Sequence, residues 1–142
     1  MGVEAAWKTR IATVNINAPT PLIDELQDLS KVYQYDKFRA GDTYSAIQNW
    51  DTVEGDTHRA ERTNDTDPGN LIYRWDGLTS FEVRLFRNGT TDPPITFSIS
   101  ENGTDWTLLT TPTPTKSSDL GGTWYFYTYQ AADLTNTNYL KI

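Results

Sequence analysis

The chain of 142 residues contains no cysteine, one histidine and one methionine. Without cysteine, neither a disulfide framework nor thiolate metal ligation is available. One histidine cannot supply the imidazole set of a zinc site or of a related metal triad. These absences exclude folds held together by disulfide bonds and most metal sites built from histidine or cysteine.

Basic residues are also few, since 12 lysines and arginines face 19 aspartates and glutamates for a net charge of −7. Such a surface repels phosphate backbones and anionic lipid head groups. No apolar run approaches the roughly 18 residues of a membrane span, and the start MGVEAAWK lacks a charged segment followed by an apolar one. We therefore expect neither nucleic acid nor a membrane as a partner.

Aromatic residues make up 13% of the chain, and threonine, asparagine, aspartate and glycine are abundant. This composition favours short strands joined by polar turns. The segment ITFSIS places Ile95, Phe97 and Ile99 on one face, and the turn Asn102-Gly103 leads into DWTLLT, which predicts a hairpin. Similar short alternating segments recur along the chain. They predict an all-β fold, a β-sandwich of jelly-roll type with about eight or nine antiparallel strands.

The domain organisation depends on how residues 1–21 are interpreted. They end in APTP, and two prolines in four residues make a stiff, extended joint. The preceding IATVNIN alternates like a strand, so it is either the last strand of a preceding domain or the first strand of this one. We favour a linker or the tail of a preceding domain over residues 1–21, followed by one β-sandwich domain over residues 22–142.

Several phrases within residues 22–142 occur in a consistent order: DELQDLSKVY, GDTHRAERT, FSISENGTDWTLL and WYFYTYQAADLTNTNYLKI. Together they resemble the galactose-binding-like β-sandwich carbohydrate-binding modules of bacterial glycoside hydrolases. The resemblance implies a non-catalytic domain that holds an enzyme on its polysaccharide, often with a structural calcium ion. The expected partners are then a polysaccharide and the catalytic domain of the same parent chain, in a secreted, monomeric bacterial protein.

Sugars offer C–H faces to aromatic rings and hydroxyls to planar amide, carboxylate and guanidinium groups. Trp50 lies in the long segment 36–57, which has no clear periodicity, and Gln48 and Asn49 precede it. Long loops in compact domains are often functional. We therefore expect Trp50, Gln48 and Asn49 to contact ligand, unless Trp50 is a loop anchor that plugs one end of the sandwich.

The segment TWYFYTYQ (123–130) divides between two faces because strand side chains alternate. One face carries Tyr125, Tyr127 and Tyr129, and the other carries Trp124 and Phe126. Similar modules have a valine and a lysine where this chain has Tyr125 and Phe126, which implies that the tyrosines point inward. Trp124 and Phe126 would then be exposed together as a ligand platform. The alternatives are a covering loop, such as 111–122, or a register shifted by one residue.

The segment HRAERT (58–63) places Arg59 and Glu61 on the outer side if Ala60 faces the core. A guanidinium can bond two sugar hydroxyls or a uronate carboxylate at once, so both residues are candidate ligand contacts. Ordinary surface ion pairing is the favoured interpretation for any one of them. For Trp75 and Trp106 a core position is the favoured interpretation.

Calcium prefers six to eight oxygen ligands. The resemblance matches the metal ligands of similar modules to Asp24 or Glu25 and to Asp42 in this chain. A solvated acidic edge explains the same residues. We expect no catalytic residues. The alternative functions are a small jelly-roll polysaccharide lyase or glycosidase domain, in which the solitary His58 would act, and a cell-surface adhesion module.

Overall fold

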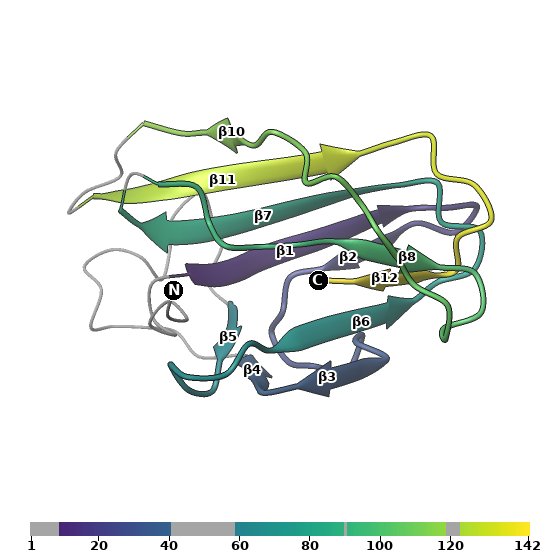
Figure 1. Ribbon diagram of the computed structural model, residues 1–142, viewed down its shortest axis with the longest axis horizontal. Coiled ribbons are helices and arrows are strands. Elements are labelled where there is room, and N and C mark those ends of the chain that lie inside the picture. Colours follow the sequence, from purple (N-terminus) through teal and green to yellow (C-terminus); the bar gives the residue numbers. More distant parts are fainter. Residues whose placement is uncertain (1–8, 41–58, 90, 119–122) are drawn as a thin grey trace.

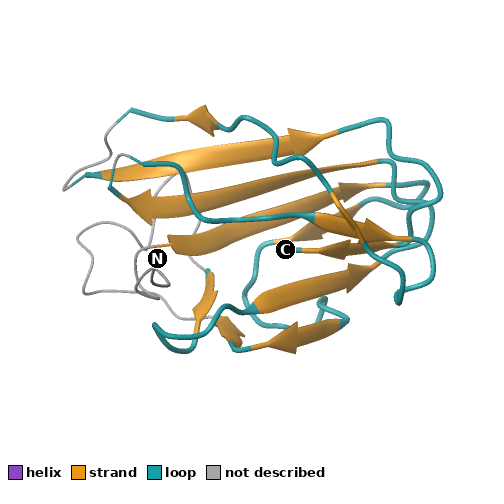
Figure 2. Cartoon of the chain, viewed as in Figure 1, coloured by secondary structure: helices purple, strands orange, loops and turns teal. Residues whose placement is uncertain are grey.

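The computed structural model describes residues 9–40, 59–89, 91–118 and 123–142. Within these ranges the chain forms two antiparallel β-sheets and no helix (Figures 1 and 2). The predicted all-β sandwich is confirmed. Its twelve strands exceed the eight or nine expected, because many of them are only two or three residues long.

The larger sheet, called sheet A here, has seven strands. In spatial order they are β10 (Thr115–Lys116), β11 (Trp124–Ala131), β7 (Ser80–Asn88), β1 (Thr9–Asn17), β5 (Ala60–Arg62) and β4 (Phe38–Ala40), with β2 (Leu22–Asp24) paired to the other part of β1. The smaller sheet, sheet B, has five strands. They are β3 (Gln34–Asp36), β6 (Asn70–Arg74), β12 (Tyr139–Lys141), β8 (Ser98–Ser100) and β9 (Thr107–Leu108).

The inner faces of the two sheets build one main hydrophobic core. Its members alternate along the long strands, as side chains of period two require, except at one irregularity in β1. On the central strands β7 and β11, the inward residues include Val83 and Leu85 beside Tyr127 and Tyr129. Sheet B contributes inward residues that include Leu140 on β12. The predicted hairpin forms between β8 and β9, with Ser98 opposite Leu108 and Ile99 opposite Thr107.

Residues 9–17 are not a linker, which corrects the predicted boundary at residue 21. They form β1, a central strand that pairs with β7 from end to end (Figure 1). Ile11, Val14 and Ile16 of this strand lie in the main core. The proline-rich segment that follows connects β1 to β2 as antiparallel neighbours, with Ile16 opposite Leu22. Its stiffness therefore serves a turn inside the domain and not a joint between domains.

Strand β1 contains a β-bulge between Ile11 and Thr13, where its register against β7 shifts by one residue. Ile11 lies opposite the inward Leu85, and Thr13 lies opposite the outward Arg84. Ala12 is the extra residue, and it is fully buried in a small cluster outside the main core. A bulge of this kind lets two successive residues face one side of the sheet.

A buried polar contact joins the two sheets. Asp24 at the end of β2 is 1% exposed, and its Oδ2 accepts a hydrogen bond from the Tyr73 hydroxyl of β6 at 2.8 Å. Its Oδ1 accepts the backbone N–H of Leu26 at 2.9 Å, and Leu26 has the positive φ of 58°. Burial, with the neighbouring Asp24 carboxylate, raises the pKa of Tyr73 well above its ordinary value. Tyr73 therefore stays a neutral donor at physiological pH.

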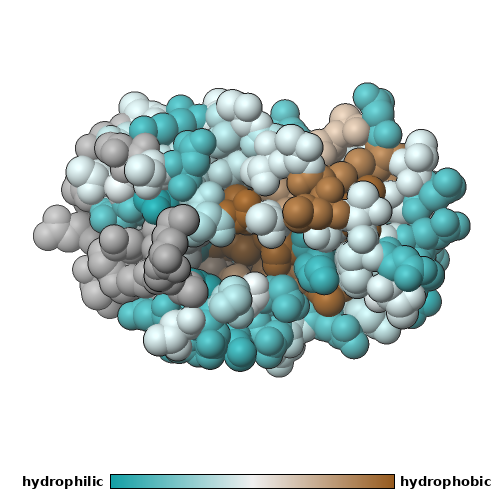
Figure 3. All heavy atoms as spheres, in the orientation of Figure 1, coloured by the Kyte–Doolittle hydropathy of each residue, from teal (hydrophilic) through white to brown (hydrophobic). Residues whose placement is uncertain are grey.

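Hydrophobic residues gather in the middle of the face seen in Figure 3, and hydrophilic residues surround them. Among the described residues no helix has the length and apolar character needed to cross a membrane.

Candidate functional site

Trp124 and Phe126 lie on the outer side of sheet A, opposite to the tyrosines, so the predicted division of this strand into two faces is confirmed. The expectation that the two rings are exposed is wrong. Trp124 is 7% exposed and Phe126 is 3% exposed. Neither ring is open to a sugar in this arrangement.

Cross-strand neighbours on the same face bury these rings. Phe126 lies opposite Phe86 of β7, with ring centroids 3.9 Å apart. The Arg84 guanidinium lies 4.2 Å from the centre of the Phe126 ring, and that of Arg10 lies 5.3 Å from Trp124. Such cation–π contacts place the charged end of an arginine over the ring face where a sugar would otherwise stack.

Arg59 and Glu61 also lie on the outer side of sheet A, as expected, because Ala60 between them is fully buried in the main core. Both are nevertheless buried, with 2% and 3% exposure. Glu61 accepts hydrogen bonds from the Nε atoms of Arg10 at 3.1 Å and of Arg39 at 2.9 Å. The expectation of open ligand contacts at Arg59 and Glu61 is therefore wrong, and Glu61 belongs to an internal ion-pair network.

The remaining candidates from the long loop, Trp50 with Gln48 and Asn49, lie outside the described residues. Asp42 and His58 lie outside them as well. These expectations stay predictions.

The calcium ligands expected at Asp24 and Glu25 do not form a site by themselves. Both Asp24 oxygens accept hydrogen bonds, from Leu26 and Tyr73, and Glu25 accepts one from the Gln27 side chain at 3.0 Å. The parts of the chain that the structure describes contain no group of three or more histidine, cysteine, aspartate or glutamate side chains suited to a metal ion. Asp42, the third expected ligand, lies outside the described residues, so the expected calcium ion stays a prediction.

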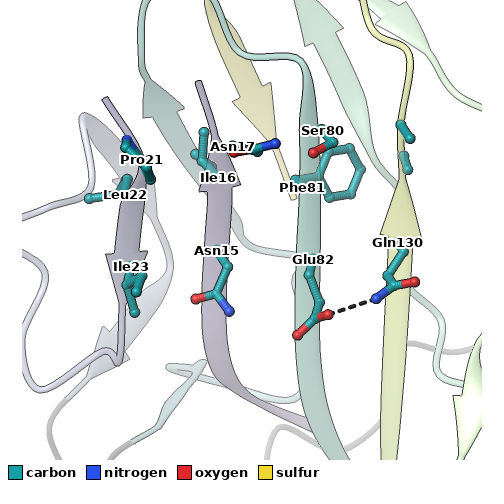
Figure 4. A pocket seen from close by; sticks show the side chains of 12 residues that line it. Asn15, Ile16, Asn17, Pro21, Leu22, Ile23, Ser80, Phe81, Glu82 and Gln130 are labelled. Carbon is teal, nitrogen blue, oxygen red and sulfur yellow. Dashed lines mark hydrogen bonds between the residues drawn. The ribbon is translucent and has the colours of Figure 1, made fainter. Parts of the chain in front are cut away.

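A groove of about 440 Å³ crosses the outer face of sheet A, away from the arginine–aromatic cluster. Four of its side chains form one row across four neighbouring strands (Figure 4): Ile23 on β2, Asn15 on β1, Glu82 on β7 and Gln130 on β11. The strand registers place these residues directly opposite one another. Gln130 donates its side-chain N–H to Glu82 at 2.7 Å. The row therefore presents two amides, a carboxylate and an exposed apolar side chain on a sheet that holds them in fixed positions.

Two polar atoms beside this row have unsatisfied hydrogen-bonding capacity. The Thr13 Oγ1 and Asn15 Oδ1 atoms are buried, and neither has a hydrogen-bond partner among the described residues. Both residues face outward from β1, where Thr13 lies opposite Arg84 and Asn15 opposite Glu82. Buried polar groups in folded proteins nearly always find a partner in protein, water or ligand. Of the two residues, only Asn15 lines the groove.

The outer face of sheet B carries aromatic rings that remain accessible. Tyr33, just before β3, is 50% exposed. It contacts Tyr139 of β12 edge to face at 5.9 Å, and Tyr139 in turn contacts Trp106 at 6.2 Å. Trp106 is partly exposed on this outer face, so its expected core position is wrong. Trp75, the other tryptophan expected in the core, is partly buried and packs against it.

Reasoning from the sequence missed the groove because its residues come from segments to which the sequence analysis gave other roles. Asn15 belongs to the segment assigned to a linker, and Gln130 ends the aromatic strand. Alternation alone shows that Glu82 faces outward, since Phe81 and Val83 face the core. That signal identifies the outer face of each strand, but only the pairing registers show which outward residues become neighbours.

Comparison with family models, with curated proteins and with solved structures gives no match for this chain. The fold itself defines an all-β sandwich of two antiparallel sheets. Its two outer faces differ in chemistry: sheet A carries a polar groove, and sheet B carries partly exposed aromatic rings.

Proposed function

We propose that this domain is a non-catalytic carbohydrate-binding module and that a neutral glycan chain binds in the groove of sheet A. In the full protein the module would hold an appended polysaccharide-degrading domain on its substrate, as the resemblance implies. The observation that carries the proposal is the cross-strand row of Asn15, Glu82 and Gln130.

Planar polar groups in a fixed row suit a sugar because each pyranose presents several hydroxyls that both donate and accept hydrogen bonds. Glu82 accepts and Gln130 both donates and accepts, and the Asn15 side chain lies next to Glu82 in the same row. Ile23, which is 59% exposed, supplies an apolar edge for the C–H face of a ring. The central strands β1 and β7 hold this row rigidly, so binding costs little ordering entropy.

A binding role is favoured over glycoside hydrolysis by the groove's carboxylate content. Hydrolysis uses two carboxyl groups on opposite sides of the scissile bond. Among the residues that line the groove, Glu82 is the only carboxylate and no histidine is present. The groove therefore offers recognition chemistry without the acid–base pair.

Affinity electrophoresis tests the proposal in gels that contain xylan, xyloglucan, galactomannan or mixed-linkage β-glucan. At least one polysaccharide should retard the wild-type domain without the release of reducing ends. Gln130→Ala removes a donor and acceptor and should weaken binding about tenfold, the effect of roughly 1.4 kcal/mol. Isothermal titration with oligosaccharides of the retarding glycan gives the affinities.

Gln27→Ala is a matched control, because Gln27 is also an exposed glutamine that donates its amide to a glutamate, Glu25, but lies outside the groove. It should leave retardation unchanged. If all four polysaccharides fail to retard the wild type, or if Gln27→Ala and Gln130→Ala weaken binding equally, the groove is not the glycan site. Release of oligosaccharides by the purified domain would instead support the lyase or glycosidase alternative.

A further inference from the structure

The three inner strands of sheet B, β6, β12 and β8, present a surface of unusual charge. Because Leu71, Tyr73 and Leu140 lie in the core, the alternate residues of β6 and β12 face outward. The outward positions on these three strands are Asn70, Ile72, Arg74, Tyr139, Lys141, Ser98 and Ser100. They include two cations and no carboxylate, in a chain whose net charge is −7.

Both cations lie against aromatic rings. The Arg74 guanidinium lies 5.6 Å from the centre of the Tyr33 ring and 5.9 Å from that of Tyr139. The Lys141 ammonium lies 4.2 Å from the centre of the Trp106 ring. These contacts limit the positions of two long side chains before any ligand arrives.

Neither Arg74 nor Lys141 has an ion-pair partner among the residues that the structure describes. This contrasts with Arg10 and Arg39, which share Glu61, and with Lys37, which lies 3.7 Å from Asp67. The two cations on sheet B are therefore available to form ion pairs with a ligand.

The aromatic rings beside them are held in a defined arrangement. A Cβ atom at Gly103 would lie only 2.9 Å from the Tyr139 ring, so the β8–β9 turn packs tightly against that ring. Gly103 also has a φ of 83°, which other residues rarely adopt. Tyr139 is thus fixed in the centre, and the accessible Tyr33 and Trp106 lie on either side of it.

We propose that this outer face of sheet B is a second glycan-binding surface and that it takes a carboxylate-bearing glycan, a polyuronate. The C–H face of a uronate ring would stack on Tyr33 or Trp106, and its carboxylate would bond to Arg74 in the two-pronged geometry that guanidinium favours. Lys141 would receive a second carboxylate along the chain. The site is separate from the groove of sheet A, where the Glu82 carboxylate disfavours an anionic sugar.

Affinity electrophoresis and isothermal titration with polygalacturonate, alginate and a polyglucuronate test this surface. At least one of them should bind the wild type. Raising the salt concentration from about 0.01 M to about 1 M shortens the screening length from about 30 Å to about 3 Å and should weaken the binding strongly. Methyl-esterified polygalacturonate keeps the ring faces but lacks the charge, so it should bind at least about tenfold more weakly than the acid form.

Variants localise the binding to the proposed face. Arg74→Gln and Lys141→Gln should each weaken polyuronate binding by about tenfold and reduce its salt dependence. Tyr33→Ala should weaken it, whereas Tyr35→Ala is the matched control. Tyr35 is equally accessible, with 55% exposure against 50% for Tyr33, but the Arg74 guanidinium lies over Tyr33. Lys31→Gln serves as the control for the loss of one exposed positive charge.

The proposal is overturned if none of the three polyuronates binds, or if Arg74→Gln with Lys141→Gln binds them as the wild type does. It is also overturned if light scattering shows a dimer that Tyr33→Ala dissolves, because the face would then be a contact between copies. Gln130→Ala separates this test from the proposed function. That variant should lose neutral glycans and keep polyuronates, so either site can fail without the other.

Discussion

On both outer faces of the sandwich, cations lie over aromatic rings, but the rings are closed off on sheet A and accessible on sheet B. Arg84 lies over Phe126, which is 3% exposed, whereas Arg74 lies over Tyr33, which is 50% exposed. The same pair of side-chain types thus builds a covered layer on one face and an open surface on the other. The difference comes from the neighbours across the strands, since Phe86 packs directly against Phe126.

The largest expected effect tests whether the aromatic layer on sheet A is structural. Phe126→Ala removes a buried ring that packs on Phe86 at 3.9 Å, and should lower the free energy of unfolding by about 3–5 kcal/mol. Tyr33→Ala on sheet B should lower it by less than about 1 kcal/mol, because half of that side chain is already in water. Urea unfolding measures both. Equal losses would remove the distinction between the two faces.

Glu61→Gln tests the ion pairs that close the same layer. Glu61 is 3% exposed and is bonded by Arg10, which is also buried. Removing its charge takes away the carboxylate to which the buried Arg10 guanidinium bonds, which should cost about 3 kcal/mol of unfolding free energy. Lys37→Gln breaks the exposed pair with Asp67 and should cost less than about 1 kcal/mol. If the two variants unfold at the same urea concentration, the network at Glu61 adds nothing beyond a surface pair.

Tyr73→Phe tests the buried contact that joins the sheets bearing these two faces. It removes the hydroxyl that donates to Asp24 and leaves a buried carboxylate oxygen without that donor. The expected loss of unfolding free energy is about 1–3 kcal/mol. Tyr129→Phe is a useful control, as its ring is equally buried in the same core but the hydroxyl does not bond to Asp24. A loss confined to Tyr73→Phe identifies the hydrogen bond as the cause.

Alkaline pH acts on the tyrosine hydroxyls in the interior between the two faces. Burial raises the pKa values of Tyr73, Tyr127 and Tyr129 above their ordinary value of 10.0. In the unfolded chain these hydroxyls ionise near pH 10, whereas the folded protein keeps them neutral. Their contribution to stability is therefore complete below pH 10 and is lost as the pH rises above it. Between pH 9 and pH 11 the urea midpoint of the wild type should fall by more than that of Tyr73→Phe. A wild-type midpoint that stays constant over this range would contradict the raised pKa values of the buried tyrosines.

Much of the fold was predictable because period-two alternation is strong in the long strands. The division of Tyr127, Tyr129 and Phe126 between two faces follows from the residue order alone, and so does the hairpin at Asn102-Gly103. The inward direction of the tyrosines was implied by the resemblance to similar modules. The role of residues 9–17 was not predictable in the same way. An alternating segment before two prolines is equally compatible with a preceding domain and with a first strand, and only long-range pairing with β7 decides between them.

The candidate site was less predictable because it depends on contacts between distant strands. Nothing near Phe126 in the sequence indicates that Phe86 and Arg84 cover its ring. Likewise Asn15, Glu82 and Gln130 become neighbours only through the registers of three strands. Aromatic content indicated where rings are numerous. Whether a ring is accessible depends on its cross-strand partners, which a local pattern does not contain.

The bulge in β1 determines the parity of that strand, that is, which of its residues face the core and which face outward. Counted back from the outward Thr13 in strict alternation, Ala12 and Arg10 would face the core and Ile11 would face outward. One unpaired residue reverses this parity, so that Ile11 enters the core and Arg10 reaches Glu61 and Trp124. Deleting Ala12 would join the two correctly facing parts of the strand directly. Inserting a second residue there would also leave Ile11 inward and Arg10 outward in strict alternation, but both would move to new partners on β7, so at this point shortening by one residue disturbs the sheet less than lengthening.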